Sequence, residues 1–442
     1  MLLDSRQVNA RTLNIAVAGL GNVGAETVRL ILKQRAGFAA RTGVRLGLSW
    51  VCDRSVREKA RHLGLPSRVR LTRDPSRILR DPGVDLVVEL FGGQREAKAL
   101  VLGALRAGKH VVTANKLLLS HCWGELAGAS AAAERSIGFE AAVAGGIPII
   151  QAIRSGLAAN RIDSVSGILN GTTNYILSRM AHEGCELREA LAEAQRLGMA
   201  ERDPKLDLDG TDTAHKVSVL ASMLTGRWLP HRRIPRVGIE RIEAEDIRFG
   251  LATLGRTVRL IGTVALDWRS SPPVVEAHVQ PVLVPLRHPL AAVHGGYNAL
   301  LVQASSAGDL MFYGKGAGPG PAASAVLADI LAIGGGTTPG MGIPCAEGSL
   351  RLAAESPAPR YLKLRVKDVP GALSGIAGIL GRAGISIARI HQDVHTEARS
   401  RFVPVMITTH ETTRRQIELA WRQLRALDSV APTHTCLRML QE

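Results

Sequence analysis

The 442-residue sequence is short of aromatic residues, which make up 3% of it, and its five cysteines form no Cys-x-x-Cys pair. A disulfide framework or a cysteine-ligated zinc site would need paired spacings. The cysteines instead lie far apart, at Cys52, Cys122, Cys185, Cys345 and Cys436. Scarce aromatics also leave few platforms for stacked bases. Because the net charge of +16 is spread along the chain, we expect no nucleic-acid partner.

Long apolar runs are also missing. The most apolar stretch, residues 324–333, is short and is interrupted by Asp329, whereas a membrane-spanning helix needs about 20 apolar residues. The first residues, MLLDSRQVNAR, contain no apolar segment of signal-peptide length. We therefore expect a cytoplasmic protein without a membrane partner. Its length suits about two to four globular domains.

A glycine-rich turn stands near the N-terminus. In TLNIAVAGLGNVGAETVRLIL, residues 12–32, a short apolar strand leads into Gly19-Leu20-Gly21-Asn22-Val23-Gly24 and then into apolar residues at helical spacing. In a GxGxxG turn of this kind the first glycine permits the tight turn and the second lets the backbone approach a pyrophosphate, while the third lets the helix pack closely. The segment predicts a dinucleotide-binding site.

Strand and helix patterns alternate after this turn. Further strands are predicted at residues 84–90, 110–116 and 136–143, with helices between them. Such alternation favours an α/β fold with a parallel, Rossmann-like sheet. Ligands bind these sheets at the carboxyl ends of the strands, and Thr113 and Lys116 lie at one of these ends. Lys116 is either a solvated surface residue or a functional group beside the nicotinamide.

Asp53 and Arg54 end the second predicted strand and give opposite indications about the coenzyme. An acid at this place suits the ribose hydroxyls of NAD, and a neighbouring arginine suits the 2′-phosphate of NADP. The nine Lys and Arg of residues 54–80 form either a solvated face or part of a phosphate site, so NAD and NADP both stay open. The interval from Gly24 to Asp53 exceeds the usual ~20 residues, which predicts an insertion near residues 37–43.

Beyond about residue 150 the strand and helix repeat is no longer regular. A helix is predicted over residues 187–198, with Leu197 on its apolar face. Asp209 or Thr211 can cap the helix that follows.

The chain becomes acidic in ERDPKLDLDGTDTAHK, residues 201–216. Asp212 and Lys216 are four residues apart on the predicted helix and therefore share one face. They form either a surface ion pair or part of an active site. A hydride-transfer enzyme needs a group that exchanges the alcohol proton, and an amino-acid substrate needs a carboxylate for its ammonium group.

Five motifs together resemble those of homoserine dehydrogenases. They are GLGNVG, TANK, EAAVAGGIP, GILNGTTNYIL and AERDPKLDLDGTDTAHK, in matching order and spacing over roughly residues 12–345. The resemblance implies reversible interconversion of L-homoserine and L-aspartate 4-semialdehyde with NAD or NADP, in the biosynthesis of threonine, methionine and isoleucine.

The resemblance also implies roles for individual residues of this chain. Lys216 would exchange the proton of the substrate oxygen, Asp212 would orient Lys216, and Lys116 would lie between nicotinamide and substrate and polarise the carbonyl. The amino and hydroxyl groups of the substrate would be held by Glu201 and Asp207, with Thr172 in the adjoining loop.

A structural monovalent cation, usually sodium, is implied in the same way. Its ligands would be the Glu140 side chain and three backbone carbonyls, those of Val143, Gly145 and Ile147. The resemblance further places Gly318 near the cofactor, in a return segment, residues 315–345, that completes the nucleotide-binding domain. Relatives often have proline where this chain has Lys315, which adds positive charge near the coenzyme.

Residues 360–442 follow the pattern strand, helix, strand, strand, helix, strand. With VKDVPGALSGIAGIL this pattern resembles an ACT domain of ferredoxin-like βαββαβ fold. In similar enzymes an ACT domain binds an amino-acid effector at a domain interface, which implies feedback inhibition by threonine. The alternative is a domain that only stabilises the oligomer.

These observations predict the domain organisation. A nucleotide-binding domain (1–147, completed by 315–345) is followed by an α+β substrate-binding, catalytic and dimerisation domain (148–314), a linker (346–359) and an ACT regulatory domain (360–442). The resemblance implies a dimer or tetramer. Two other functions stay in view: a different amino-acid dehydrogenase on the same fold, and a non-catalytic amino-acid sensor. An aspartate-semialdehyde dehydrogenase would need an activated cysteine, and no cysteine here has such a context.

Overall fold

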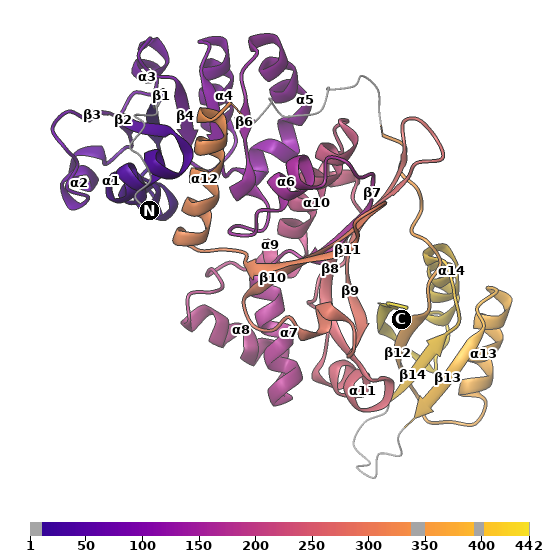
Figure 1. Ribbon diagram of the computed structural model, residues 1–442. Coiled ribbons are helices and arrows are strands. Elements are labelled where there is room, and N and C mark those ends of the chain that lie inside the picture. The colour runs from indigo at the N-terminus through magenta and orange to yellow at the C-terminus, as the bar shows by residue number, and fades with distance from the viewer. Residues whose placement is uncertain (1–10, 337–349, 393–401, 442) are drawn as a thin grey trace, which may run out of the picture.

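The computed structural model describes residues 11–336, 350–392 and 402–441. These residues form two sheets, one in the N-terminal part and a larger one that reaches into the C-terminal part (Figure 1). Residues 1–10 and 337–349 lie outside the described residues, and with them lie Cys345, the end of the predicted return segment and the start of the predicted linker. Within the described residues, no helix is long and apolar enough to cross a membrane.

The N-terminal sheet is parallel throughout, and in the described part of the chain its strand order is β3-β2-β1-β4-β5-β6. This is the order of doubly wound dinucleotide-binding folds, so the Rossmann-like prediction is confirmed. The strands are β1 (Arg11–Ala18), β2 (Val44–Cys52), β3 (Arg70–Thr72), β4 (Leu86–Glu89), β5 (His110–Thr113) and β6 (Ile137–Gly138).

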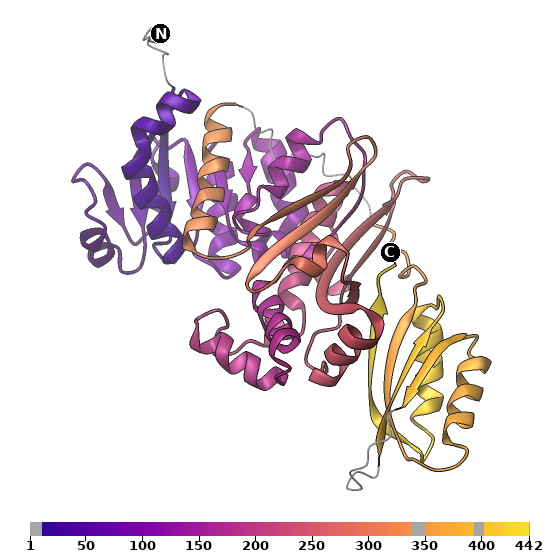
Figure 2. The ribbon, with the colours of Figure 1, turned by 60° about the horizontal axis from the view of Figure 1, so that its bottom comes forward.

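Strand β1 is buried on both faces, as expected of a parallel sheet covered by helices. Ile15 and Val17 pack into one apolar core, and Ala16 and Ala18 pack into another. The surrounding helices are α1 (Asn22–Thr42), α2 (Val56–His62), α3 (Ser76–Arg80), α4 (Arg95–Arg106), α5 (Lys116–Ala133) and α12 (Pro319–Gly334). Helix α12 comes from the predicted return segment and lies beside α1 (Figures 1 and 2).

The predicted insertion near residues 37–43 is not a separate loop. Helix α1 runs without a break from Asn22 to Thr42 and ends at Gly43, whose φ of 71° gives the left-handed cap. The extra residues before Asp53 therefore lengthen the helix. Gly37 sits inside it, where a glycine costs only about 1 kcal/mol.

The larger sheet is mixed, and among the described residues its strand order is β11-β10-β7-β8-β9-β15-β12-β14-β13. Its first five strands along this order are β11 (Gly308–Lys315), β10 (Tyr297–Ala304), β7 (Ile162–Ile168), β8 (Arg256–Asp267) and β9 (Val274–Pro285). The helical segments of this part are η1 (Glu140–Ala142), α6 (Ile149–Gln151), η2 (Ala152–Gly156), α7 (Gly171–Glu183), α8 (Leu187–Arg196), α9 (Lys205–Leu208), α10 (Thr211–Thr225), η3 (His231–Arg233), α11 (Ala244–Leu254) and η4 (Pro289–Ala292).

The C-terminal part has the predicted βαββαβ order. Its elements are β12 (Arg360–Val366), α13 (Ala372–Arg382), β13 (Ile387–Gln392), β14 (Val403–Thr409), α14 (Arg414–Leu424) and β15 (Val430–Met439). Both helices lie along one side of the four strands (Figure 2). Strand β15 pairs in parallel with β9 through Arg438 and Val282, so the larger sheet continues from β9 into the C-terminal part.

Three local predictions are wrong. The strand predicted at 110–116 ends at Thr113, and Lys116 is the first residue of helix α5. The strand predicted at 136–143 ends at Gly138, because the backbone N–H of Glu140 donates to Asp329 and the chain turns into η1. Leu197, placed on an apolar helix face, follows the end of α8 and is 58% exposed. Since it lies past the last helical residue, the helical spacing no longer sets its direction.

Candidate active site

A cleft lies between the nucleotide-binding sheet and the elements of the larger sheet. Two adjoining cavities form it, with volumes of about 470 and 720 Å³. Both are lined by residues from the two parts of the chain: Val23, Ala114, Lys116, Glu201, Asp207 and Asp212. The larger cavity also reaches Asn22, Thr172, Lys216 and Gly318. The structure therefore brings most of the predicted nicotinamide and substrate residues to one place.

Asp212 joins the two predicted catalytic lysines. Its Oδ1 lies 2.9 Å from the Nζ of Lys116, and its Oδ2 lies 2.7 Å from the Nζ of Lys216. Burial would raise the pKa of Asp212, but the two ammonium groups outweigh it and hold the pKa far below its usual range. The carboxylate is thus charged and oriented on both oxygens.

Helix α10 places Asp212 and Lys216 on one face, as the spacing predicts. The helix begins after Gly210, whose φ of 80° is left-handed, and the Asp209 side chain accepts a hydrogen bond from the Thr211 N–H at 2.8 Å. Asp212 lies in the first turn, where the helix dipole favours a negative charge. Lys216 follows one turn later.

The two lysines sit in different surroundings. Lys216 is 8% exposed, and its Nζ also donates to the Leu169 carbonyl at 2.5 Å. Burial is the largest influence on Lys216 and lowers its pKa, although Asp212 opposes this. Burial also favours the neutral form of Lys116, but there Asp212, Asp207 and Glu201 prevail and raise the pKa. One amine is therefore easier to deprotonate and the other stays an ammonium.

Asn170 belongs to the site, although only Thr172 of its loop was predicted from the sequence. Asn170 caps α7 by accepting the Thr173 N–H at 2.8 Å. Its Nδ2 donates to Asp207 at 2.6 Å and to Asp212 at 3.0 Å. An Asn directly before a predicted helix is a capping signal, but the contact with two distant carboxylates depends on the tertiary fold.

The remaining predicted substrate residues line the cleft. Burial raises the pKa of Asp207 against the hydrogen bond from Asn170. Glu201 is exposed to the cleft from the segment before α9. The Thr172 hydroxyl donates to the Met199 carbonyl at 2.9 Å. This geometry presents carboxylate oxygens beside a lysine, which suits a ligand that carries both an ammonium and a hydroxyl group.

The glycine-rich turn has the geometry that its motif needs. Gly19 has a φ of 103°, and a Cβ there would collide with the Leu90 carbonyl. A Cβ on Gly24 would collide with the Gly19 carbonyl, which explains the close fit of turn and helix. Gly21 borders open space, so a phosphate can approach the backbone at the start of α1.

Asp53 and Arg54 line a separate cavity of about 590 Å³, together with Gly19, Gly21, Lys59 and Arg73. The Asp53 carboxylate accepts the N–H groups of Leu20 and Ser55, each at 2.8 Å, and pairs with Lys59 at 2.9 Å. Burial acts to raise the pKa of Asp53, but these bonds lower it below the ordinary value. Asp53 therefore stabilises the glycine-rich turn through its hydrogen bond with the Leu20 N–H.

Some predicted residues lie behind the cavity walls. Thr113 is fully buried and its hydroxyl donates to Glu89 at 2.6 Å, so the neighbouring Ala114, Asn115 and Lys116 line the cleft instead. Leu20 is buried beneath the turn.

Glu140 is also buried, and its two oxygens accept the N–H groups of Ile150 and Gln151, each at 2.8 Å. Burial and nearby Asp329 raise its pKa to about 7. Val143 and Ile147 are buried in the same segment, and Gly145 lines the larger cavity.

A dinucleotide turn facing a buried lysine is the arrangement of an NAD(P)-dependent oxidoreductase, in which the protein orients a substrate and manages its proton. Three family models match this chain and agree with that class. The model "Homoserine dehydrogenase" matches residues 148–331, the model "Homoserine dehydrogenase, NAD binding domain" matches residues 19–140, and the model "ACT domain" matches residues 360–428. The chain belongs to the homoserine dehydrogenase family.

The similarity to individual relatives covers nearly the whole chain. A homoserine dehydrogenase of Neisseria gonorrhoeae is 37% identical over 440 residues, which cover 97% of this chain and 99% of the relative. The crystal structure of a homoserine dehydrogenase from Thiobacillus denitrificans, 34% identical, superposes with a TM-score of 0.89 over 97% of this chain and 98% of the other. A hyperthermophilic archaeal homoserine dehydrogenase mutant, solved in complex with NADPH, is 27% identical with a TM-score of 0.60, over 73% of this chain and 97% of the other.

Proposed function

We propose that this cytoplasmic enzyme interconverts L-homoserine and L-aspartate 4-semialdehyde, with Lys216 exchanging the proton of the substrate oxygen. The coenzyme, when bound, accepts the hydride from the carbon that carries the hydroxyl group. Lys216 takes the hydroxyl proton in this direction and returns it in the other. Lys116 keeps its charge and stabilises the negative charge that develops on the same oxygen.

The observation that carries this assignment is the shared carboxylate of Asp212. Its two oxygens contact the two lysines, and the pKa of Lys216 is lowered while the pKa of Lys116 is raised. When similar groups have pKa values pushed apart, they suit separate acid and base tasks. The neutral amine needed for homoserine oxidation is therefore easier to form at Lys216 than at Lys116.

The substrate's ammonium group is assigned to Glu201 and Asp207. Both line the cleft beside Lys116 and Asp212, and carboxylates are the usual partners of an ammonium group. Thr172, at the start of α7, lines the same cavity and is assigned to the adjoining loop of the substrate site.

NADP is the favoured coenzyme. The Asp53 carboxylate is already occupied by Leu20, Ser55 and Lys59, which leaves it less able to bind ribose hydroxyls. Arg54 and Arg73 line the same cavity and suit a 2′-phosphate. The NADPH complex of the archaeal relative supports the same choice.

A structural monovalent cation such as sodium is assigned to the Glu140 segment. Burial and Asp329 raise the pKa of Glu140 to about 7, and a nearby cation would stabilise the charged carboxylate. Ala144 and Gly145 have φ values of 55° and 53°, so the backbone makes a tight left-handed turn between Val143 and Ile147. The carbonyl ligands that we assign come from this turn, and oxygen donors suit such a cation.

The predicted domain boundaries and a regulatory role for the ACT domain complete the proposal. An amino acid such as threonine is the proposed effector, and a dimer or tetramer is the proposed assembly. A cavity of about 200 Å³ between β9 and the ACT elements is the proposed place for this effector; Arg414 and Glu418, which line it, pair with each other at 2.9 Å.

The test is NAD- and NADP-linked oxidation of L-homoserine by the full chain, with and without L-threonine. We expect turnover that is faster with NADP and is inhibited by threonine. A folded Lys216→Ala variant that still binds coenzyme should lose turnover. Intact coenzyme binding without turnover of the natural chain would favour a different substrate or an amino-acid sensor.

A further inference from the structure

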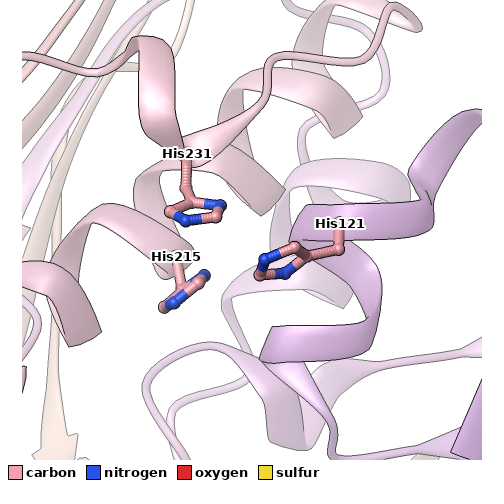
Figure 3. A group of neighbouring side chains, drawn as sticks. All are labelled: His121, His215 and His231. Carbon is pink, nitrogen blue, oxygen red and sulfur yellow. The ribbon is translucent and has the colours of Figure 1, made fainter. Parts of the chain in front are cut away.

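Three histidines from separate elements meet beside the active-site cleft. His121 lies on α5, His215 on α10 and His231 on η3, and their rings face a common space (Figure 3). One potential ligand atom from each ring lies within 4.8 Å of the other two. His215 and His231 are buried, and His121 is partly exposed.

A bend in helix α5 positions the His121 ring. The helix bends at Cys122, whose φ and ψ of −128° and 17° are not helical, and the Trp228 indole N–H donates to the Ser120 carbonyl at 2.9 Å. This bond ties α5 to the segment between α10 and η3, and therefore brings His121 next to the other two histidines.

One nitrogen of each of two rings is already held by a protein oxygen atom. His121 Nδ1 lies 2.8 Å from the Leu117 carbonyl, and His215 Nδ1 lies 2.7 Å from the Ser120 hydroxyl. Metal-binding histidines are usually oriented in this way, because a bond at one nitrogen directs the lone pair of the other toward the ion. His231 differs, since its buried Nδ1 has no hydrogen-bond partner among the residues that the structure describes.

Two of the three histidines, His215 and His231, have lowered pKa values. Burial, followed by the neighbouring charges, lowers the pKa values of His215 and His231 to about 4. Both rings are thus neutral at pH 7. Lys116 near His215, and Arg232 and Arg236 near His231, disfavour added positive charge, whereas Asp212 favours it.

We propose that His121, His215 and His231 form a binding site for a transition-metal ion of the zinc class. Imidazole ligands suit zinc, copper and nickel rather than magnesium or calcium, and three histidines leave a fourth position for water. Zinc–nitrogen bonds of about 2.0–2.1 Å require the rings to move inward. His215 lines the cleft, which gives the ion a route from solvent.

Metal binding here inhibits the enzyme. His215 directly precedes Lys216 on α10, and its electrostatic neighbours include Asp212 and Lys116. An ion at this site adds positive charge beside the lysines and competes for the Asp212 carboxylate. The inhibition is reversed by a chelator.

The experiment measures zinc affinity of the chelator-treated full chain by competition with a chromophoric chelator, and the visible spectrum after cobalt(II) addition. We expect one ion per chain and the stronger visible absorption of four-coordinate cobalt. His231→Ala removes a ligand and should abolish both signals. Ser120→Ala, which keeps all three rings, should weaken zinc binding about 10- to 100-fold and serves if His231→Ala does not fold.

A matched control is His182→Ala. His182 pairs with His294 elsewhere, with ring centroids 4.9 Å apart, and its loss should leave the affinity unchanged. Equal zinc affinity in the natural chain, His231→Ala and Ser120→Ala would overturn the site. A thiolate charge-transfer band with cobalt would also overturn it, by assigning the ion to cysteine. Because binding is measured without turnover, the result does not depend on the proposed reaction.

Discussion

Asp212 and Lys216 form an ion pair of 2.7 Å one turn apart on α10, and both side chains are nearly buried, at 12% and 11% exposure. An exposed pair at this spacing contributes only about 0.3–0.5 kcal/mol. Here the carboxylate also holds Lys116 and accepts from Asn170. The pair is therefore part of a buried network at the cleft, and the alternative of a solvated surface pair does not hold.

Replacing Lys216 should remove the proton-exchanging group. We expect Lys216→Ala to lower kcat for homoserine oxidation by about 10²- to 10⁴-fold, the usual contribution of general acid-base catalysis, with little change in coenzyme affinity. Steady-state kinetics and coenzyme titration check this. Lys205→Ala, on the exposed surface of α9, is the matched control and should keep full activity. A Lys216→Ala enzyme with near-normal kcat would assign the proton transfer to another group.

Asp212→Asn should move the pH profile. Burial lowers the pKa of Lys216 and Asp212 opposes this effect, so loss of the carboxylate lowers that pKa further. Homoserine oxidation needs the neutral amine. The acidic limb of kcat/KM should therefore shift to lower pH, while the maximum rate falls because Lys116 loses its partner. Asp203→Asn, exposed at the same cleft, should leave the limb in place. If the acidic limb of kcat/KM stays in place in Asp212→Asn, a group other than Lys216 sets that limb.

Relationships within one element could be predicted from the sequence. The glycine-rich turn and the spacing of Asp212 and Lys216 each follow from local geometry. The contact of Lys116 with Asp212 could not, because it depends on how two parts of the chain pack. Its implied role came only from the family resemblance. The histidine cluster was missed for the same reason, since its members come from three elements.

The errors have local causes. The long interval from Gly24 to Asp53 suggested an insertion, but these residues lengthen α1, since the cost of Gly37 in a helix is smaller than the gain of a long helix packed on the sheet. Thr113 was placed at the right strand end, yet successive side chains in a strand point to opposite faces. Its hydroxyl turns toward Glu89, whereas the predicted Lys116, which is the first residue of α5, reaches the cleft.

Arg54→Ala should discriminate between the coenzymes. If Arg54 binds the 2′-phosphate, its loss removes a charge-assisted bond of about 1.5–3 kcal/mol. This corresponds to a rise of about 10- to 100-fold in KM for NADP, at 1.4 kcal/mol per tenfold, with KM for NAD unchanged. Arg57→Ala, exposed on α2, is the control. An equal effect on both coenzymes would remove Arg54 from the 2′-phosphate site.

Glu355 ties the ACT strands to the catalytic sheet. Its carboxylate contacts Arg360 of β12 at 2.8 Å, Arg438 of β15 at 2.5 Å and Gln280 of β9 at 2.7 Å. Burial acts to raise its pKa, but the charge of Arg360 and the hydrogen bond from Gln280 prevail and lower it from 4.5 to about 2. A depressed carboxyl pKa stabilises the fold above the unfolded value, and this contribution is lost as the pH falls through the folded value.

Glu355→Gln should therefore destabilise the ACT part in a pH-dependent way. At pH 7 we expect a loss of about 3 kcal/mol, since the fall of the carboxyl pKa from 4.5 to about 2 is converted at about 1.36 kcal/mol per tenfold change in proton affinity. The difference from the natural chain should shrink as the pH falls from 4.5 toward 2. Urea unfolding, with hydrogen exchange of β12, measures it. Asp267→Asn is the control, because its partner Arg269 is 90% exposed and exposed pairs contribute little. A pH-independent difference would mean that Glu355 acts through packing rather than charge.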